Sequence, residues 1–140
     1  MSIIVTWYPD HKNIVYVRFE TDWSWGDFYT MNEDFNALAN SVPEPIAALI
    51  DVSQTNMPAN FIAQLPKIAS ISNSERPTNL DLTVVVGLRG IIETAVSIFS
   101  RVYRQAASHL LMANTVDEGL MAITTHRNKS PEPEKQTEPL

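Results

Sequence analysis

Three short apolar runs, separated by helical patterns, constrain the fold more than any other feature of this sequence. The runs span residues 46–52, 80–87 and 108–113, and each is nearly continuous, as a strand buried on both faces would be. Between them, apolar residues recur every three or four positions over residues 57–71 and 90–104, a spacing typical of amphipathic helices. Because crossovers of this kind are right-handed, we expect the three strands to lie parallel in one sheet.

Two strand patterns and one helix precede these runs. Residues 3–8 are rich in β-branched and aromatic side chains, residues 13–20 alternate apolar and polar, and the polar link between them favours an antiparallel hairpin. A helix is expected over residues 25–40, capped by Asp22 or Ser24 and stopped by the prolines that follow.

The last helix begins at a capping box, Thr115-Val116-Asp117-Glu118, and is expected to extend to about Arg127. The predicted fold class is therefore α/β, with a mixed five-stranded sheet and about four helices mostly on one face. The order of the elements is β-β-α-β-α-β-α-β-α. The N-terminal hairpin is antiparallel, and the βα units after it are parallel.

The length of 140 residues fits one domain. We assign residues 1–127 to this domain. Residues 128–140 hold three prolines and five charges and only one large apolar residue, which predicts a disordered, acidic, proline-rich tail.

Composition excludes several classes of protein. The absence of cysteine excludes disulfides, thiolate metal sites and cysteine nucleophiles. A formal net charge of −6 argues against nucleic-acid binding, which needs clustered Lys and Arg. No apolar stretch approaches the roughly 18 residues of a membrane span, and no basic segment precedes the first apolar run as in a secretory signal. We expect a cytoplasmic protein.

No catalytic or metal-binding motif is present. His11, His109 and His126 lie on separate predicted elements without a second ligand at metal-binding spacing. The four glycines form neither a nucleophile elbow nor a phosphate-binding loop. The sequence therefore predicts a protein that is not an enzyme and that needs no cofactor or metal.

Polar residues follow the buried strands, at the edge where the carboxyl ends of parallel strands meet. Asp51 ends the first buried run, the segment 53–56 follows it, and the turn 87–90 contains Arg89. Functional groups collect at this edge in α/β sheets. Asp51 either caps its own turn or acts as an acid or base, and Arg89 with the glycine turn offers a place for an anion.

Several segments together resemble the STAS-like domains, named for sulfate transporters and anti-sigma-factor antagonists. They are Asp22-Trp23-Ser24-Trp25-Gly26-Asp27-Phe28, Ile50-Asp51-Val52-Ser53, Arg76-Pro77, Leu82-Thr83-Val84-Val85-Val86-Gly87 and Asn114-Thr115-Val116-Asp117-Glu118-Gly119-Leu120. The resemblance runs over nearly all of residues 1–127, as a pattern of elements more than as a dense motif.

The resemblance implies binding to a protein partner. In the switch members of the family, a partner kinase phosphorylates a hydroxyl in an Asp-Ser-Ser/Thr-Gly stretch that follows an Asp-x-Ser strand end. Here the strand end is present as Asp51-Val52-Ser53, but Asn60 falls near the expected acceptor position. Ser53 and Thr55 are the nearest hydroxyls, so the phosphoswitch itself is not supported.

We therefore expect a non-catalytic STAS-like interaction module that binds a protein partner through the edge after the third strand. The interaction or regulatory residues expected there are Asp51, Ser53, Thr55, Asn56, Asn60 and Arg89. Two alternatives stay open: a domain that binds a small apolar molecule or a lipid, and an enzyme that uses Asp51.

Aromatic residues suggest two further features. Trp23 and Trp25 either anchor a partner or pack in the core, with packing favoured. Tyr16 is predicted to stand exposed on a partly solvated face of the sheet, where it would support a homodimer.

Overall fold

The structure is a computed structural model, and it describes residues 3–11, 13–55, 62–74, 77–87, 91–102 and 109–129. The strands are β1 (Ile3–Trp7), β2 (Ile14–Phe19), β3 (Ile46–Asp51), β4 (Leu80–Val86) and β5 (Leu110–Ala113). The helices are α1 (Trp25–Asn40), a 3-10 turn η1 (Ile62–Gln64), α2 (Leu65–Ser74), α3 (Ile91–Val102) and α4 (Val116–Lys129).

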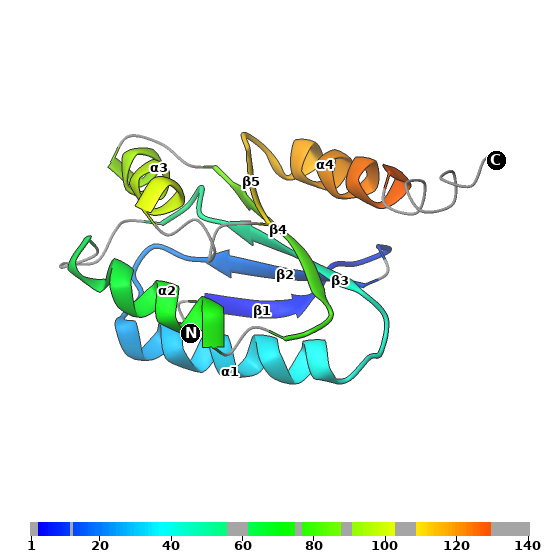
Figure 1. The fold of residues 1–140 in the computed structure, drawn as a ribbon, viewed down its shortest axis with the longest axis horizontal. Coiled ribbons are helices and arrows are strands. Elements are labelled where there is room, and N and C mark those ends of the chain that lie inside the picture. The colour runs from blue at the N-terminus through cyan, green and yellow to red at the C-terminus, as the bar shows by residue number, and fades with distance from the viewer. Residues whose placement is uncertain are drawn as a thin grey trace.

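The five strands form one sheet in the order β1-β2-β3-β4-β5, so each strand lies beside its neighbours in the sequence (Figure 1). β1 pairs with β2 antiparallel, and every later pair is parallel. The predicted fold class, a mixed sheet with an N-terminal hairpin followed by parallel βα units, is confirmed.

The hairpin between β1 and β2 closes through residues that tolerate a left-handed backbone. Asp10 and Asn13 have φ angles of 64° and 60°, and Asp and Asn adopt this region more readily than other non-glycine residues. The Tyr8 N–H donates to the Ile14 carbonyl oxygen at 2.8 Å. These residues explain why a polar link suffices to reverse the chain here.

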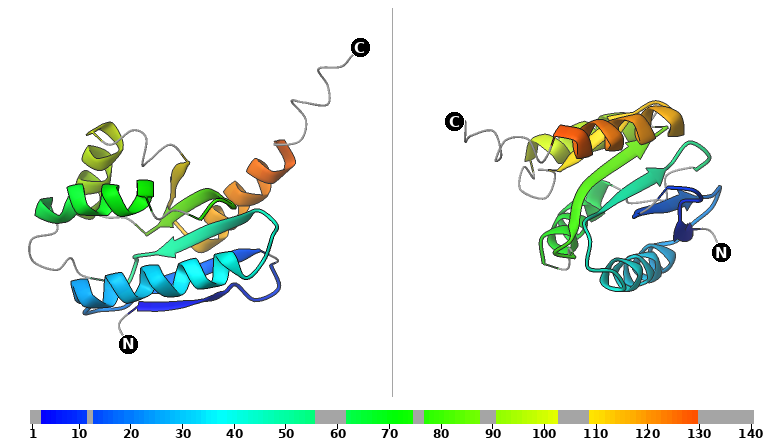
Figure 2. Two further views of the ribbon diagram at one scale, coloured as in Figure 1. Left: turned by 60° about the horizontal axis from the view of Figure 1, so that its bottom comes forward. Right: turned by 90° about the vertical axis from the view of Figure 1, so that its right-hand side faces the viewer.

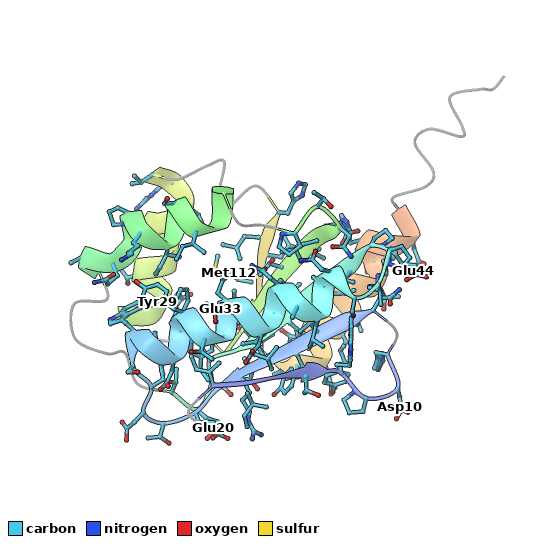
Figure 3. The ribbon with its side chains drawn as sticks, turned by 90° about the horizontal axis from the view of Figure 1, so that it is seen from below. Asp10, Glu20, Tyr29, Glu33, Glu44 and Met112 are labelled. Carbon is cyan, nitrogen blue, oxygen red and sulfur yellow. The ribbon has the colours of Figure 1, made fainter. Side chains whose placement is uncertain are left out.

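Helices cover both faces of the sheet, whereas the sequence pattern predicted them mostly on one face, so the molecule has three layers. α1 packs against β1 and β2, while α4 packs on the opposite face against β3, β4 and β5 (Figure 2). α2 lies on the α1 side of the sheet, which is the side that faces the viewer in Figure 3. Alternate residues of β3 therefore enter two separate cores, Ile46 and Ala48 on the α1 side and Ala47 and Leu49 on the α4 side.

α1 begins as its sequence predicts. Ser24 is the N-cap: its Oγ accepts a hydrogen bond from the Asp27 N–H at 3.1 Å, and the Asp27 carboxylate accepts one from the Ser24 N–H at 3.0 Å. This reciprocal capping box satisfies two of the free N–H groups at the helix start. Trp23, just before the cap, is buried and packs edge-on against both Phe19 and Trp25, as a core residue.

α4 extends two residues further than predicted. Asn128 and Lys129, which the sequence pattern assigned to the tail, belong to the helix, and residues 130–140 lie outside the described residues. The last turn is held because Arg127 Nη2 donates to the Asn13 carbonyl oxygen at 2.9 Å, across 114 positions of the sequence.

Gly119 tests how tightly α4 docks on the sheet. A Cβ at this position would lie 2.7 Å from Leu49 Cδ1 and 2.9 Å from Val86 Cγ1, both fully buried side chains. We expect Gly119→Ala to lower the free energy of unfolding by roughly 1–3 kcal/mol through overpacking, despite its better helix propensity. Urea denaturation measures this.

Gly26 is the matched control. It lies in the first turn of α1, where the nearest atom to an added Cβ, Ser24 Oγ, is 3.6 Å away. Gly26→Ala should leave stability unchanged or raise it by up to about 1 kcal/mol. Equal effects of the two substitutions would contradict the tight docking of α4.

Candidate functional site

The candidate site lies where β3 ends. Asp51 is the last residue of the strand and is 7% exposed, although it is a carboxylate. Its Cα pairs with Arg18 on β2 and with Val86 on β4, so it lies between the carboxyl ends of two neighbouring strands. Buried carboxylates require hydrogen-bond partners, and the structure supplies them.

Three hydrogen bonds reach the Asp51 carboxylate. The Tyr16 hydroxyl donates to Oδ2 at 2.7 Å, while Ser53 donates to Oδ1 twice, through its Oγ at 2.6 Å and its backbone N–H at 3.0 Å. Both carboxylate oxygens are therefore engaged by groups of the same domain. The two hydroxyl distances are those of charge-assisted hydrogen bonds to an ionised acceptor.

These bonds determine the ionisation of Asp51. Burial alone would raise the pKa of Asp51, but the Ser53 and Tyr16 hydrogen bonds and the charge of Arg18 outweigh it and hold the pKa below its ordinary value of 3.8. Conversely, burial and the bond to Asp51 raise the pKa of Tyr16 well above its ordinary value. At neutral pH the pair is a carboxylate and a neutral phenol.

Gly87 closes the same edge from β4. It has a φ of 84°, and an added Cβ would lie 2.5 Å from Ser53 Cβ and 2.7 Å from Ser53 Cα. The Val52 N–H also donates to the Val86 carbonyl oxygen at 3.0 Å. The turn after β3 therefore rests directly on the end of β4, and only glycine allows this approach.

The structure brings together part of the predicted site. Asp51 and Ser53 are in direct contact, and Thr55 follows them, buried, with its N–H donating to the Val52 carbonyl oxygen at 3.4 Å. Gln54 is exposed between them. Asn56, Asn60 and Arg89 lie outside the described residues.

Tyr16 is the residue that the sequence pattern placed wrongly. It was predicted to stand exposed on an open face, but it is half-buried and its hydroxyl bonds to Asp51. Its ring also packs edge-on against Tyr8, with centroids 5.4 Å apart. The alternation of β2 does place Tyr16 and Arg18 on one face, but only the pairing of β2 with β3 shows that Asp51 lies on that face too.

Chemically, this arrangement favours a fixed, charged turn over an acid or base. A carboxylate with a lowered pKa carries no proton at neutral pH, and accepting three internal hydrogen bonds leaves it a weak base. Within the described ranges, no group of three or more His, Asp or Glu residues is placed to hold a metal ion. None of the described helices is long and apolar enough to cross a bilayer.

A groove lies at the other end of the sheet. It has a volume of about 280 Å³ and is lined by Trp7, His11, Asn13, Ser41 and Val42. These residues come from the end of β1, the hairpin turn and the end of α1. β2 and β3 run parallel. The groove lies beside the start of β2, whereas Asp51 lies at the end of β3, so the groove and the Asp51 turn are at opposite ends of the sheet.

Comparison with known protein families and with curated proteins gives no match to this chain. The resemblance to the STAS-like domains therefore rests on the residues and element order of the chain itself.

Replacing Asp51 tests the hydrogen-bonded turn. Asp51→Asn removes the charge and turns an amide N–H₂ toward donors, so we expect a loss of about 1–3 kcal/mol of unfolding free energy at pH 7. Because the pKa of Asp51 is lowered on folding, its stabilising contribution is present above pH 4 and is lost as pH falls through the folded-state pKa. Urea denaturation at pH 7 and near pH 3 should therefore show the difference between variant and wild type shrinking in acid.

Tyr16→Phe is the matched partner variant. It removes one donor and leaves the two Ser53 bonds, so it should cost about 1 kcal/mol at pH 7 and less than Asp51→Asn. A difference between Asp51→Asn and wild type that is equally large at both pH values would contradict the ionised, hydrogen-bonded state of Asp51.

Proposed function

We propose that this protein is a non-catalytic, STAS-like interaction module that binds a protein partner through the edge after β3. The observation that carries the proposal is that both oxygens of Asp51 are bound by Tyr16 and Ser53. The carboxylate serves the turn itself, which argues against the alternative of an enzyme that uses Asp51 as a general acid or base.

A rigid turn suits recognition. Ser53 is held by Asp51 from one side and by the close approach of Gly87 from the other. A segment that is already ordered loses little conformational entropy when a partner binds. Gln54 is the exposed side chain of this turn in the described part of the edge, so it is the position at which a docked partner would be contacted.

Site-specific photocrosslinking tests the proposal. A benzophenone amino acid at Gln54 places the probe on the turn. The control probe is at Thr78, which is exposed just before β4 begins and therefore lies at the opposite end of the sheet. We expect a discrete protein adduct from position 54 that is absent from position 78, when both variants are irradiated in cells.

The adduct should also depend on the turn. It should weaken at least several-fold when the probe at position 54 is combined with Gly87→Ala, because the added Cβ would displace Ser53. Circular dichroism would first establish that this variant is folded. The same adducts from positions 54 and 78, or none from either, would argue against a partner at this edge.

The groove beside β1 supports a second candidate function, the binding of a small apolar molecule. Trp7 and Val42 provide apolar surface, and His11, Asn13 and Ser41 provide polar groups beside it. Its volume of about 280 Å³ lies just below the roughly 300–1,000 Å³ of typical ligand pockets, which suits a small molecule better than a long lipid chain.

Native mass spectrometry of gently purified protein tests this candidate. Ser41→Trp would fill the groove, whereas Asn40→Trp adds the same ring at the neighbouring exposed position, which does not line it. We expect a retained small molecule in wild type and Asn40→Trp that is lost in Ser41→Trp. Wild-type protein without a bound molecule would count against this second function.

A further inference from the structure

β5 ends the sheet on the side away from the hairpin, and its outer edge carries no charge. The strand reads Leu110-Leu111-Met112-Ala113, and none of the other described strands pairs with its outer side. Leu111 is 45% exposed and Met112 is 49% exposed, on opposite faces of the sheet. Edge strands usually carry charges, prolines or a covering element that prevent pairing, and Leu110–Ala113 has neither charge nor proline.

The ladder with β4 shows which main-chain groups of β5 point toward β4 and which point away from it. The Thr83 N–H donates to the His109 carbonyl oxygen at 2.8 Å, and the Gly87 N–H donates to that of Ala113 at 3.3 Å. Residues of a strand turn their main-chain groups alternately to one side and the other. Leu110 and Met112 therefore direct two N–H and two C=O groups outward.

We propose that a second copy of this chain pairs with this edge, β5 against β5 and antiparallel, around a two-fold axis at Leu111. In this register Leu110 lies opposite the partner's Met112, and Met112 lies opposite the partner's Leu110. Each pair exchanges two hydrogen bonds, so all four outward groups of each copy are satisfied. The two sheets, five strands from each copy, become continuous.

The side chains favour the same register. Leu111 falls on the axis as a non-hydrogen-bonded pair, where side chains come closest, so each half-exposed leucine covers the other on the α4 face. On the opposite face, half-exposed Met112 meets the partner's Leu110. If the two-fold axis passed through Leu110 or through Met112 instead, only one of the two outward-facing residues of each copy would be paired with the other strand.

The contact is small. One four-residue strand from each copy buries less surface than the roughly 1,200 Å² of a standard stable interface. We therefore expect a weak, reversible dimer. This proposal places self-association at β5 and not at Tyr16, whose hydroxyl is bound to Asp51.

Engineered cysteines test the register directly, because the chain has none of its own. In Leu111→Cys the two thiols face each other across the axis with Cα atoms about 4.5 Å apart, within the range of a disulfide. In Met112→Cys each thiol faces a leucine. Met121→Cys, at a 68% exposed position on α4, is the control for random collision.

Under mild oxidation at about 100 µM of the full chain, we expect Leu111→Cys to form disulfide dimers at least tenfold faster than either other variant. Faster dimerisation of Met112→Cys would overturn the register. Equal rates for Leu111→Cys and Met121→Cys would overturn the interface.

Sedimentation velocity supplies an independent measurement. Wild type should show a concentration-dependent dimer between about 5 and 300 µM, and Leu111→Glu and Leu111→Lys should each be monomeric because like charges meet on the axis. Mixing the two variants should restore a heterodimer, whereas Met121→Glu should behave as wild type. A monomeric wild type throughout this range, or a dimer that Leu111→Glu leaves unchanged, would overturn the proposal.

Discussion

The burial of β3 on both faces is the constraint on which the rest of this structure depends. Ile46, Ala47, Ala48 and Leu49 are each at most 2% exposed, and they supply alternate side chains to the core under α1 and to the core under α4. A strand of this kind needs a partner strand on each edge and a helix on each face, since its backbone and both sets of side chains are removed from water. The neighbours β2 and β4 and the layers α1 and α4 meet this requirement.

The same burial explains why the strand ends with an ionised residue. The Asp51 side chain lies on the face of β3 that packs under α4, where a charge would be costly without hydrogen-bond partners. Tyr16 from β2 and Ser53 from the following turn supply those partners. The carboxylate thereby ends the strand and orders the turn after it, so one residue determines both the end of the core and the shape of the edge to which we assign partner binding.

The two edges of the sheet differ for a related reason. β1 is a five-residue strand supported by α1, with Ile3 buried and Val5 and Trp7 packed on the core. β5 is shorter, and its Leu111 and Met112 remain half-exposed on opposite faces. We place a second copy at the edge of β5, where these two side chains are half-exposed.

Local patterns were sufficient for most of the fold. The bounds of α1, a cap at Asp22 or Ser24, the hairpin and the parallel βα units follow from periodicity and from turn residues that act over a few positions, and the structure shows that Ser24 is the cap. α4 ends two residues beyond the predicted end near Arg127, and its last turn is held by Asn13, which no local pattern reveals. Asn79 makes another contact that no local pattern reveals. Its amide nitrogen lies within 3.1 Å of three carbonyl oxygens, those of Ala39, Val42 and Glu44. This connects the end of α1 to the start of β4.

The sequence by itself therefore determined the class and order of the elements and the placement of Asp51 and Ser53 at the carboxyl edge, because these depend on spacing along the chain. Only the tertiary structure decided the role of Asp51. Tyr16 lies 35 positions away, and its hydroxyl reaches the carboxylate because β2 and β3 pair in a particular register. Register and layer packing are set by the fit of side chains from distant segments, so hydrogen bonds between strands, the contact of Gly87 with Ser53 and the exposed edge of β5 emerge only in the folded chain.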